Sequence, residues 1–176
     1  MSTRVVVVIG GPAGSGKTTV GRALAGEQGW ALIDSDEVRR DVHLVPRGTR
    51  LPSSAYSVQA RHRIYAEIER RAAAAFHERA GVVVTATLLP APERFLEDIG
   101  ANRLVVMCHA PEAVLRERIA ARPRDAASDA SGDVAASQLR LFGQGAATAG
   151  VDLVIDTNTK TIAAVVREIT ARLRAN

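Results

Sequence analysis

Three glycines, a lysine and a threonine near the start of the chain have a spacing with a clear chemical meaning. The segment Gly11-Pro-Ala-Gly14-Ser-Gly16-Lys17-Thr18 fits the pattern G-x-x-x-x-G-K-[ST]. Glycines let backbone N–H groups turn inward around a polyphosphate, where side chains would block its approach. A helix that starts here adds unpaired N–H groups and a partial positive charge. The pattern predicts a loop that binds the phosphates of a nucleoside triphosphate.

Within this loop, the polar side chains have expected partners. Lys17 reaches the terminal phosphates, and the Thr18 hydroxyl can ligate Mg²⁺. The late segment Thr157-Asn-Thr-Lys160 lacks the N-K-x-D pattern of a guanine-specific switch. The expected cofactors are ATP and Mg²⁺. The residues expected to bind the nucleotide are Gly11, Pro12, Ala13, Gly14, Ser15, Gly16, Lys17, Thr18 and Thr19.

Two carboxylates follow the second apolar run, in Ile33-Asp34-Ser-Asp36. In a parallel sheet the end of this strand faces the same crevice as the phosphate loop. One carboxylate can hold the water shell of the metal, and the other can take the proton of an acceptor. Asp34 and Glu37 also have the spacing of a capping box, so helix capping is an alternative that does not exclude catalysis.

Arginines recur in the segment 112–124, and two of them are four residues apart. Arg118 and Arg122 therefore share one helix face. A guanidinium stays charged and bonds phosphate oxygens in pairs, which suits stabilisation of a transferred phosphoryl group. The alternative is a solvated arginine face in an arginine-rich protein.

The region 36–65 is the candidate acceptor-binding region. Its side chains can hold a phosphate or carboxylate of the acceptor, or they can form a solvated rim. The polar and aromatic residues concerned are Arg47, Arg50, Tyr56, Arg61, His62 and Tyr65.

Apolar runs alternate with segments of helical periodicity along the whole chain. This alternation predicts an α/β fold with a parallel sheet, helices on both faces and a single domain over residues 1–176. Strands are expected at residues 4–9, 30–33, 82–84, 104–108 and 151–155. Helices are expected at 17–27, from 35, at 54–80, 91–99, from Pro111 to before Pro123, up to about 142, and at 159–173.

Composition narrows the function classes. The chain has 176 residues, a net charge of +4 and only 3% aromatic residues, which is too few for the stacking surfaces of single-strand binders. The charge suits a phosphate-bearing partner without requiring nucleic acid. No apolar run reaches the length of a membrane span, and one cysteine, Cys108, forms no internal disulfide, so we expect a cytoplasmic protein. Cys108 is expected in the core.

These motifs resemble those of the small P-loop kinases, the group of shikimate kinase, gluconate kinase, chloramphenicol phosphotransferase and polynucleotide kinase, often described as AAA-family ATP-binding proteins. Asp34-Ser35-Asp36 is similar to the D-S-D motif of shikimate kinase, and Asp36 with Arg39 is similar to the D-x-x-R of polynucleotide and antibiotic kinases. The resemblance implies that Asp36 is the catalytic base, that Asp34 holds Mg²⁺ with Thr18, and that Arg39 binds the acceptor.

The same resemblance implies a three-layer P-loop fold of the nucleoside-monophosphate-kinase type, with a small lid at about residues 123–132. A lid arginine, Arg118 or Arg122, would close over the nucleotide. Lys17 would be catalytic together with Asp36 and these arginines. Tyr56 and Arg61 would bind the acceptor together with Asp36 and Arg39. The segment 151–157 would flank the adenine.

Two positions depart from this group. Thr85 stands where relatives often carry an aspartate, which leaves Thr18 and Asp34 as the metal-side groups. The glycine triplet that binds shikimate is replaced by Leu88-Leu89-Pro90, which argues against shikimate as the acceptor.

The sequence therefore predicts a kinase that moves the γ-phosphoryl group of ATP to a hydroxyl of a small molecule. Two alternatives remain open. One is a polynucleotide 5′-hydroxyl kinase, which the basic charge and the D-x-x-R spacing favour. The other is a nucleotide-dependent binding module or slow ATPase with no phosphoryl acceptor, which the missing acid at Thr85 allows.

Overall fold

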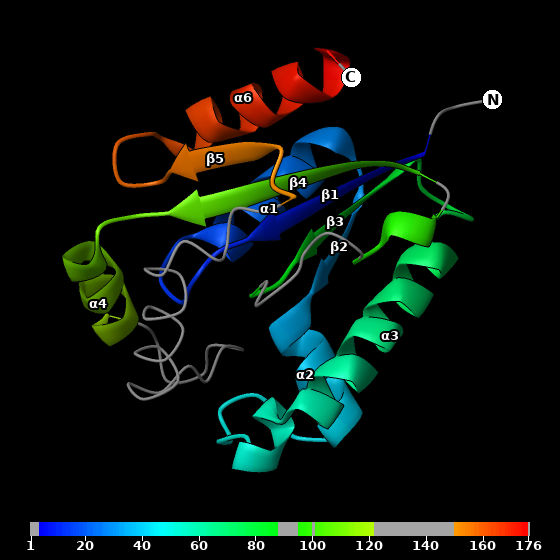
Figure 1. Cartoon of the computed structure of the whole chain (residues 1–176), viewed down its shortest axis with the longest axis vertical. Coiled ribbons are helices and arrows are strands. Elements are labelled where there is room, and N and C mark those ends of the chain that lie inside the picture. The colour runs from blue at the N-terminus through cyan, green and yellow to red at the C-terminus, as the bar shows by residue number, and fades with distance from the viewer. Residues whose placement is uncertain (1–3, 88–94, 100, 122–149, 176) are drawn as a thin grey trace.

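A five-stranded parallel sheet forms the centre of the protein (Figure 1). The structure, a computed structural model, describes residues 4–87, 95–99, 101–121 and 150–175. The strand order is β2-β3-β1-β4-β5. The strands are β1 (Val5–Gly10), β2 (Ala31–Asp34), β3 (Gly81–Thr85), β4 (Asn102–His109) and β5 (Leu153–Asp156). The predicted α/β class and parallel sheet are confirmed.

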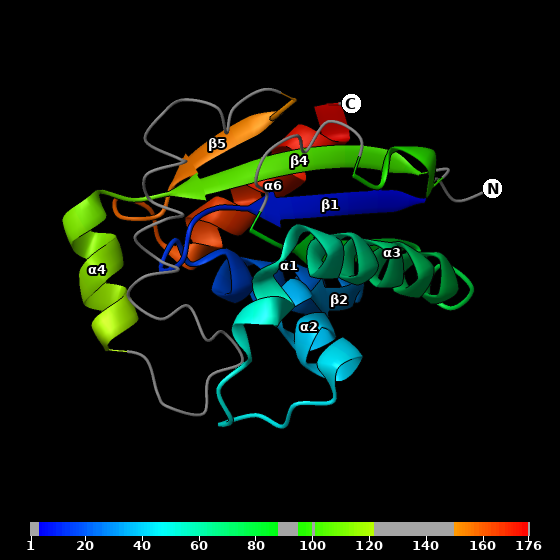
Figure 2. The ribbon, with the colours of Figure 1, turned by 60° about the horizontal axis from the view of Figure 1, so that its bottom comes forward.

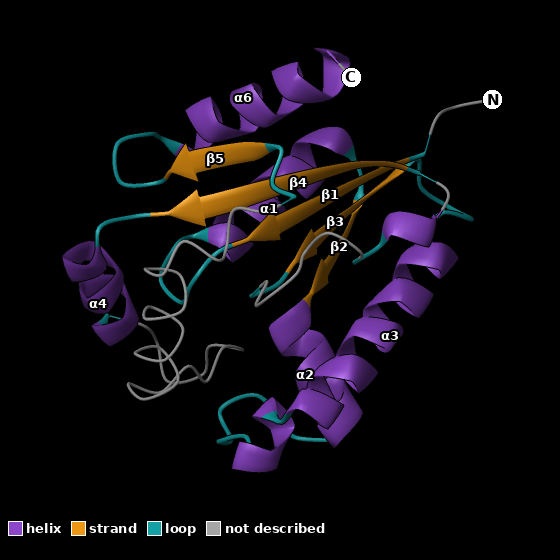
Figure 3. Cartoon of the chain, viewed as in Figure 1, coloured by secondary structure: helices purple, strands orange, loops and turns teal. Residues whose placement is uncertain are grey.

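Helices cover both faces of the sheet, which gives three layers (Figures 2 and 3). Apolar side chains of α1 and α6 pack on one face, and those of α2 and α3 pack on the other. Helix α4 follows β4 at the carboxyl end of the sheet. The α-helices are α1 (Lys17–Gln28), α2 (Ser35–His43), α3 (Val58–Ala75), α4 (Glu112–Ala120) and α6 (Ile162–Ala175). Single 3₁₀ turns occur at Ser53–Tyr56 and Glu97–Ile99.

The middle strand shows why the sequence folds this way. Successive side chains of a strand point to opposite faces, so Val6 and Val8 enter the core under α3, while Val7 and Ile9 enter the core under α1 and α6. All four are at most 1% exposed. A continuous β-branched run is therefore the pattern of a strand covered on both sides.

Several element boundaries differ from the sequence-based expectation. The helix expected at 54–80 is a 3₁₀ turn followed by α3, because the hydroxyl of Ser57 accepts the Ala60 N–H and caps the helix there. The last helix begins at Ile162 rather than at 159, and the residues before it form a turn. Pro111 is the N-cap of α4 rather than a residue of its first turn.

Other expectations fall outside the described residues. These are the helix leading to about 142, the lid at about 123–132, and most of the helix at 91–99, of which only the end is described, as turn and 3₁₀ structure. Within the described part of the chain, none of the helices is both long and apolar enough to cross a membrane.

Candidate active site

The phosphate loop joins β1 to α1, and its glycines adopt conformations that other residues avoid. Gly14 and Gly16 have φ values of 82° and 81°, and Gly11 has a φ of 144°. Gly16 is the N-cap of α1 and supplies no side-chain cap, so the N–H groups of the first turn remain directed at the loop. The Ser15 hydroxyl is buried and has no hydrogen-bond partner among the described residues. The loop therefore offers donors of the kind that a triphosphate needs.

Close packing explains two of these glycines. A Cβ on Gly14 would lie 2.7 Å from the backbone oxygen of Leu115 in α4. A Cβ on Gly11 would lie 2.4 Å from the backbone oxygen of Cys108 at the end of β4. Helix α4 and strand β4 thus support the loop from outside. Lys17, only 7% exposed, places its Nζ 3.4 Å from the Pro12 carbonyl oxygen, within the loop.

Asp34, at the end of β2, connects the phosphate loop to α2. Its Oδ2 accepts hydrogen bonds from the Thr18 hydroxyl at 2.9 Å and from the Thr85 hydroxyl at 2.7 Å. Its Oδ1 accepts the N–H groups of Asp36 at 2.8 Å and Glu37 at 3.4 Å, so it is also the N-cap of α2. The two readings of Asp34, as a cap and as a metal-side group, are therefore compatible.

The donor set around Asp34 fits a magnesium ion. Mg²⁺ prefers carboxylate and hydroxyl oxygens and keeps several of its waters. The Thr18 hydroxyl and the Asp34 carboxylate already lie in contact beside the phosphate loop. The described residues include no group of three or more His, Cys, Asp or Glu side chains that could hold a metal by themselves. Magnesium here would depend on Thr18, Asp34, water and the phosphates of the nucleotide.

Asp36 lies in the first turn of α2 and forms an ion pair with Arg39. The distance from Arg39 Nη1 to Asp36 Oδ1 is 2.6 Å, and the two side chains are only 13% and 18% exposed. The Arg39 guanidinium also stacks over the Tyr56 ring at 5.0 Å. Its Nε is buried without a hydrogen-bond partner in the part of the chain that the structure describes. Three of the predicted acceptor-binding residues are thus in one cluster.

Arg61, the fourth predicted acceptor-binding residue, lies near the same cluster through Tyr65. Burial raises the pKa of the Tyr65 hydroxyl, and the charges of Arg61 and Arg39 oppose that rise. The Tyr65 hydroxyl donates to the Thr87 carbonyl oxygen at 3.2 Å. Tyr65 therefore lies within electrostatic range of both arginines.

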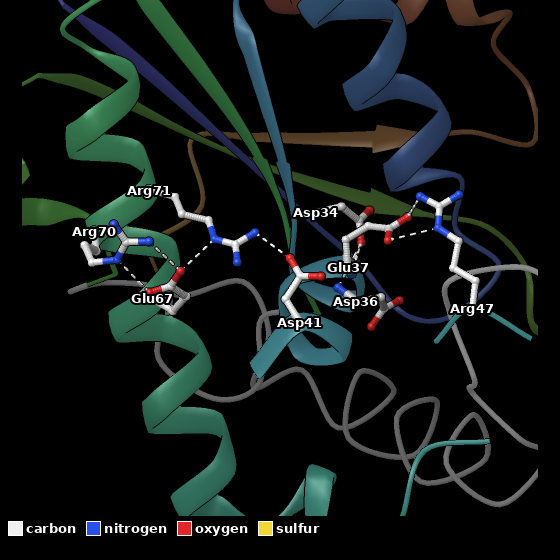
Figure 4. A network of polar contacts seen from close by, with 8 residues as sticks. All are labelled: Asp34, Asp36, Glu37, Asp41, Arg47, Glu67, Arg70 and Arg71. Atoms are coloured by element: carbon white, nitrogen blue, oxygen red, sulfur yellow. Dashed lines mark hydrogen bonds and ion pairs between the residues drawn. The ribbon is translucent and has the colours of Figure 1, made fainter. Parts of the chain in front are cut away.

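Three other residues of the predicted cluster lie on the solvated surface. Arg47, Arg50 and His62 are exposed. Arg47 pairs with Glu37, as Figure 4 shows, with its Nε 3.2 Å from Glu37 Oε2. The predicted cluster therefore divides into half-buried residues near Asp36 and exposed residues.

A second polar network holds α2 and α3 together beside the site (Figure 4). Arg71 of α3 donates to Asp41 of α2 and to Glu67 of its own helix, both at 2.8 Å. Arg70 adds two bonds to Glu67. Of these contacts, the bond from Arg71 to Asp41 is the one that joins the two helices, and both of its side chains are partly exposed.

Arg118 contacts the phosphate loop and the residue that follows β5. Its Nη2 donates to the Thr157 carbonyl oxygen at 3.0 Å, and its Nη1 lies 3.1 Å from the Thr157 hydroxyl and 3.4 Å from the Gly14 carbonyl oxygen. A cavity of about 200 Å³ adjoins these groups. It is lined by Gly16, Thr19, Val20, Arg118, Thr157, Lys160, Ile162 and Val165. Arg122, its predicted partner, lies outside the described residues.

Thr157 has a role that the sequence did not reveal. Its hydroxyl lies 2.9 Å from the Ser15 carbonyl oxygen and 3.1 Å from that of His109, so it joins the phosphate loop to the ends of β4 and β5. A hydroxyl residue directly after the last strand was the available signal.

Cys108, at the end of β4, is a core residue as predicted. It is fully buried, and burial raises the pKa of its thiol to about 12 against the opposing charge of Lys17. The thiol stays protonated at neutral pH, so it is not a nucleophile.

Comparison with known proteins shows the family of the chain. The family model described as AAA domain matches residues 6–145. A shikimate kinase of Moorella thermoacetica is 31% identical over 173 residues, which cover 96% of this chain and 94% of the relative.

Solved structures share the fold. A sugar kinase from Janibacter sp. HTCC2649 is 20% identical with a TM-score of 0.67, covering 98% of this chain and 95% of that one. A gluconokinase from Sinorhizobium meliloti 1021 is 24% identical with a TM-score of 0.62, covering 99% and 94%. The chain therefore belongs to the AAA domain family and, within it, to the small P-loop kinases, which are ATP-dependent phosphotransferases.

Proposed function

We propose that this kinase transfers the γ-phosphoryl group of ATP to a hydroxyl of a small molecule that also carries an anionic group. The observation that carries the proposal is the double role of Asp34. Its carboxylate contacts Thr18 of the phosphate loop and also caps the first turn of α2, where Asp36 lies. A base on that turn is therefore held in register with the nucleotide.

The anionic group of the acceptor is inferred from the charges beside Asp36. The positive charges of Arg39 and Arg61 both lower the pKa of Tyr65, so the two arginines lie near one another. The Arg39 Nε is buried with no hydrogen-bond partner among the described groups. Guanidinium groups bond carboxylates and phosphates through two parallel N–H donors. An acceptor with such a group would place its hydroxyl near Asp36.

Each residue then has a separate task. Lys17 and the backbone N–H groups of the loop bind the phosphates, and Thr18 and Asp34 would hold Mg²⁺. Bound magnesium neutralises charge that develops on the phosphate oxygens. Asp36 takes the proton of the acceptor hydroxyl. Catalysis then depends on positioning and charge stabilisation.

The nucleotide base is assigned to the cavity beside Thr157 and Arg118. Arg118 would contact the nucleotide there, and its role toward the transferred phosphoryl group, like that of Arg122, stays a prediction. The cavity adjoins Gly16 and Thr19, so a base bound in it would be continuous with phosphates in the loop.

A product screen tests the proposal. The protein is incubated with MgATP and four kinds of acceptor: hydroxylated carboxylates such as gluconate and shikimate, sugar phosphates, uncharged polyols, and a 5′-hydroxyl oligonucleotide. Mass spectrometry should find a phosphorylated product only among the anionic small molecules, and Lys17→Ala should abolish it. A phosphorylated oligonucleotide, a phosphorylated polyol alone, or ADP without any phosphorylated acceptor would each overturn the proposal.

A further inference from the structure

Thr85, where relatives often carry an acid, donates a hydrogen bond to the carboxylate that is assigned to the metal side. The distance from the Thr85 hydroxyl to Asp34 Oδ2 is 2.7 Å, the shortest of the four hydrogen bonds that Asp34 accepts. Thr85 and Asp34 are register partners at the ends of the parallel strands β3 and β2. Sheet pairing therefore sets the separation of the two side chains.

Packing holds the Thr85 side chain in one orientation. Thr85 is fully buried, and a Cβ on Gly21 of α1 would lie 2.4 Å from its methyl group. The absence of a side chain at Gly21 therefore makes room for this methyl group. Because β-branched residues have few accessible rotamers, a methyl group packed against α1 directs the hydroxyl toward Asp34.

The two carboxylate oxygens of Asp34 accept hydrogen bonds from different elements. Oδ1 takes the N–H groups at the start of α2, and Oδ2 takes the hydroxyls of Thr18 and Thr85. Without Thr85, the Thr18 hydroxyl would be the remaining donor to Oδ2 among these contacts. Thr18 is also the residue expected to ligate the magnesium ion. Its hydroxyl alone would therefore orient the Asp34 carboxylate poorly.

We propose that Thr85 is a positioning residue that fixes Asp34 Oδ2 for magnesium binding, and that Gly21 maintains the Thr85 rotamer by leaving space for its methyl group. The inference rests on the proposed function, since it assigns Mg²⁺ to Asp34 and Thr18. The hydroxyl at position 85 then orients the Asp34 carboxylate, whereas an acid at this position would add a second carboxylate to the site.

Thr85→Val and Thr85→Ser separate the two parts of this side chain. Valine keeps the methyl group and removes the hydroxyl, whereas serine keeps the hydroxyl. Calorimetry measures the affinity for a non-hydrolysable ATP analogue with Mg²⁺ and with EDTA, and the ratio of the two affinities is the gain due to magnesium. We expect Thr85→Val to reduce this gain about tenfold, because a hydrogen bond to a charged group is lost, and to leave the affinity in EDTA unchanged. Thr85→Ser keeps the hydroxyl but loses the methyl group that orients it, so it should lose less of the gain than Thr85→Val.

Thr170→Val is the matched control, because it makes the same chemical change at another buried hydroxyl. Unlike the Thr85 hydroxyl, that of Thr170 has no hydrogen-bond partner among the described residues. It should keep the full gain. If valine at position 85 prevents folding, Thr85→Ala replaces it with the same expectation. A second probe is Gly21→Ala, which should lower the magnesium gain while the Thr85 hydroxyl is still present.

The outcomes are distinguishable from those of the proposed function. If the unchanged protein does not bind the analogue more tightly with magnesium, the proposed site itself is wrong. If the unchanged protein shows the gain and Thr85→Val shows the same gain, Thr85 does not position Asp34. A loss of affinity in EDTA that equals the loss in magnesium would assign Thr85 a structural role only.

Discussion

Asp36 and Asp41 lie on the same helix, yet only one of them faces the acceptor cluster. Asp36→Asn should keep affinity for the ATP analogue and lower kcat for phosphoryl transfer at least about 100-fold, because an amide cannot accept the hydroxyl proton. Asp41→Asn makes the same chemical change at an exposed position that pairs with Arg71, and it should leave kcat within about twofold. Steady-state kinetics with the acceptor from the product screen measures both. Equal turnover in the Asp36 variant and the unchanged protein would exclude Asp36 as the base.

At single residues, the sequence selected candidates for chemistry but did not reveal their contacts. The residues of the phosphate loop and the pair Asp34 and Asp36 could be chosen by motif and by their place after a buried strand. The sequence placed Arg39 and Tyr56 in one candidate region. Their contact could not be predicted, because it depends on the path of the chain between α2 and α3. Thr85 looked like a missing acid, and its hydrogen bond to Asp34 follows from strand register, which one sequence does not display.

At the scale of elements, the phosphate loop and α4 depend on a glycine between them. Gly14→Ala should lower the free energy of unfolding by at least about 1 kcal/mol, because alanine is strained at a φ of 82° and its Cβ would press on Leu115. It should also weaken binding of the ATP analogue. Gly26→Ala in α1 is the control: nothing lies within 4 Å of its Cβ position, so the better helix former should add about 0.5–1 kcal/mol. Urea unfolding measures both, and a Gly14→Ala protein as stable as the unchanged one would contradict the packing argument.

Element type was predictable wherever burial and periodicity agreed, as in the β-branched run of β1. The boundaries of the helices were not predictable, because capping side chains determine where a helix begins. Ser57 starts α3 by accepting the Ala60 N–H, although helical spacing continues on both sides of it. Strand order was likewise unpredicted: alternating strands and helices imply a parallel sheet but do not say that β1 lies between β3 and β4.

For the whole molecule, the network that joins α2 and α3 should contribute to the pH dependence of stability. Hydrogen bonds from Arg70 and then Arg71 lower the pKa of Glu67 from its ordinary 4.5 to about 2. A carboxyl with a lowered folded-state pKa stabilises the protein above its unfolded pKa, and that stabilisation is lost as pH falls from about 4.5 to about 2. Because Arg70 is largely exposed, solvent screening keeps the contribution small.

Glu67→Gln should therefore flatten the dependence of the melting temperature on pH below pH 4.5 and lower the melting temperature slightly at pH 7. Glu69→Gln, an exposed change on the same helix, should keep the full dependence. Thermal melting monitored by circular dichroism at a series of pH values measures this. An unchanged slope in Glu67→Gln would show that the network does not couple to global folding.

The single cysteine connects the nucleotide site to the stability of the whole sheet. Cys108 lies at the end of β4, fully buried, and its thiol pKa of about 12 keeps it protonated. A thiol reagent can therefore react only when the carboxyl end of the sheet opens, and the reaction rate follows the population of the open form. The Cys108 carbonyl oxygen faces Gly11 of the phosphate loop, so a nucleotide that orders the loop should close this region.

Labelling at pH 8 should be slow in the native protein, fast in denaturant, and slower still with the ATP analogue and Mg²⁺ by a factor that grows with ligand concentration. Cys108→Ala should abolish the signal, and labelling without denaturant at the rate of a free thiol would contradict the burial on which the expectation depends.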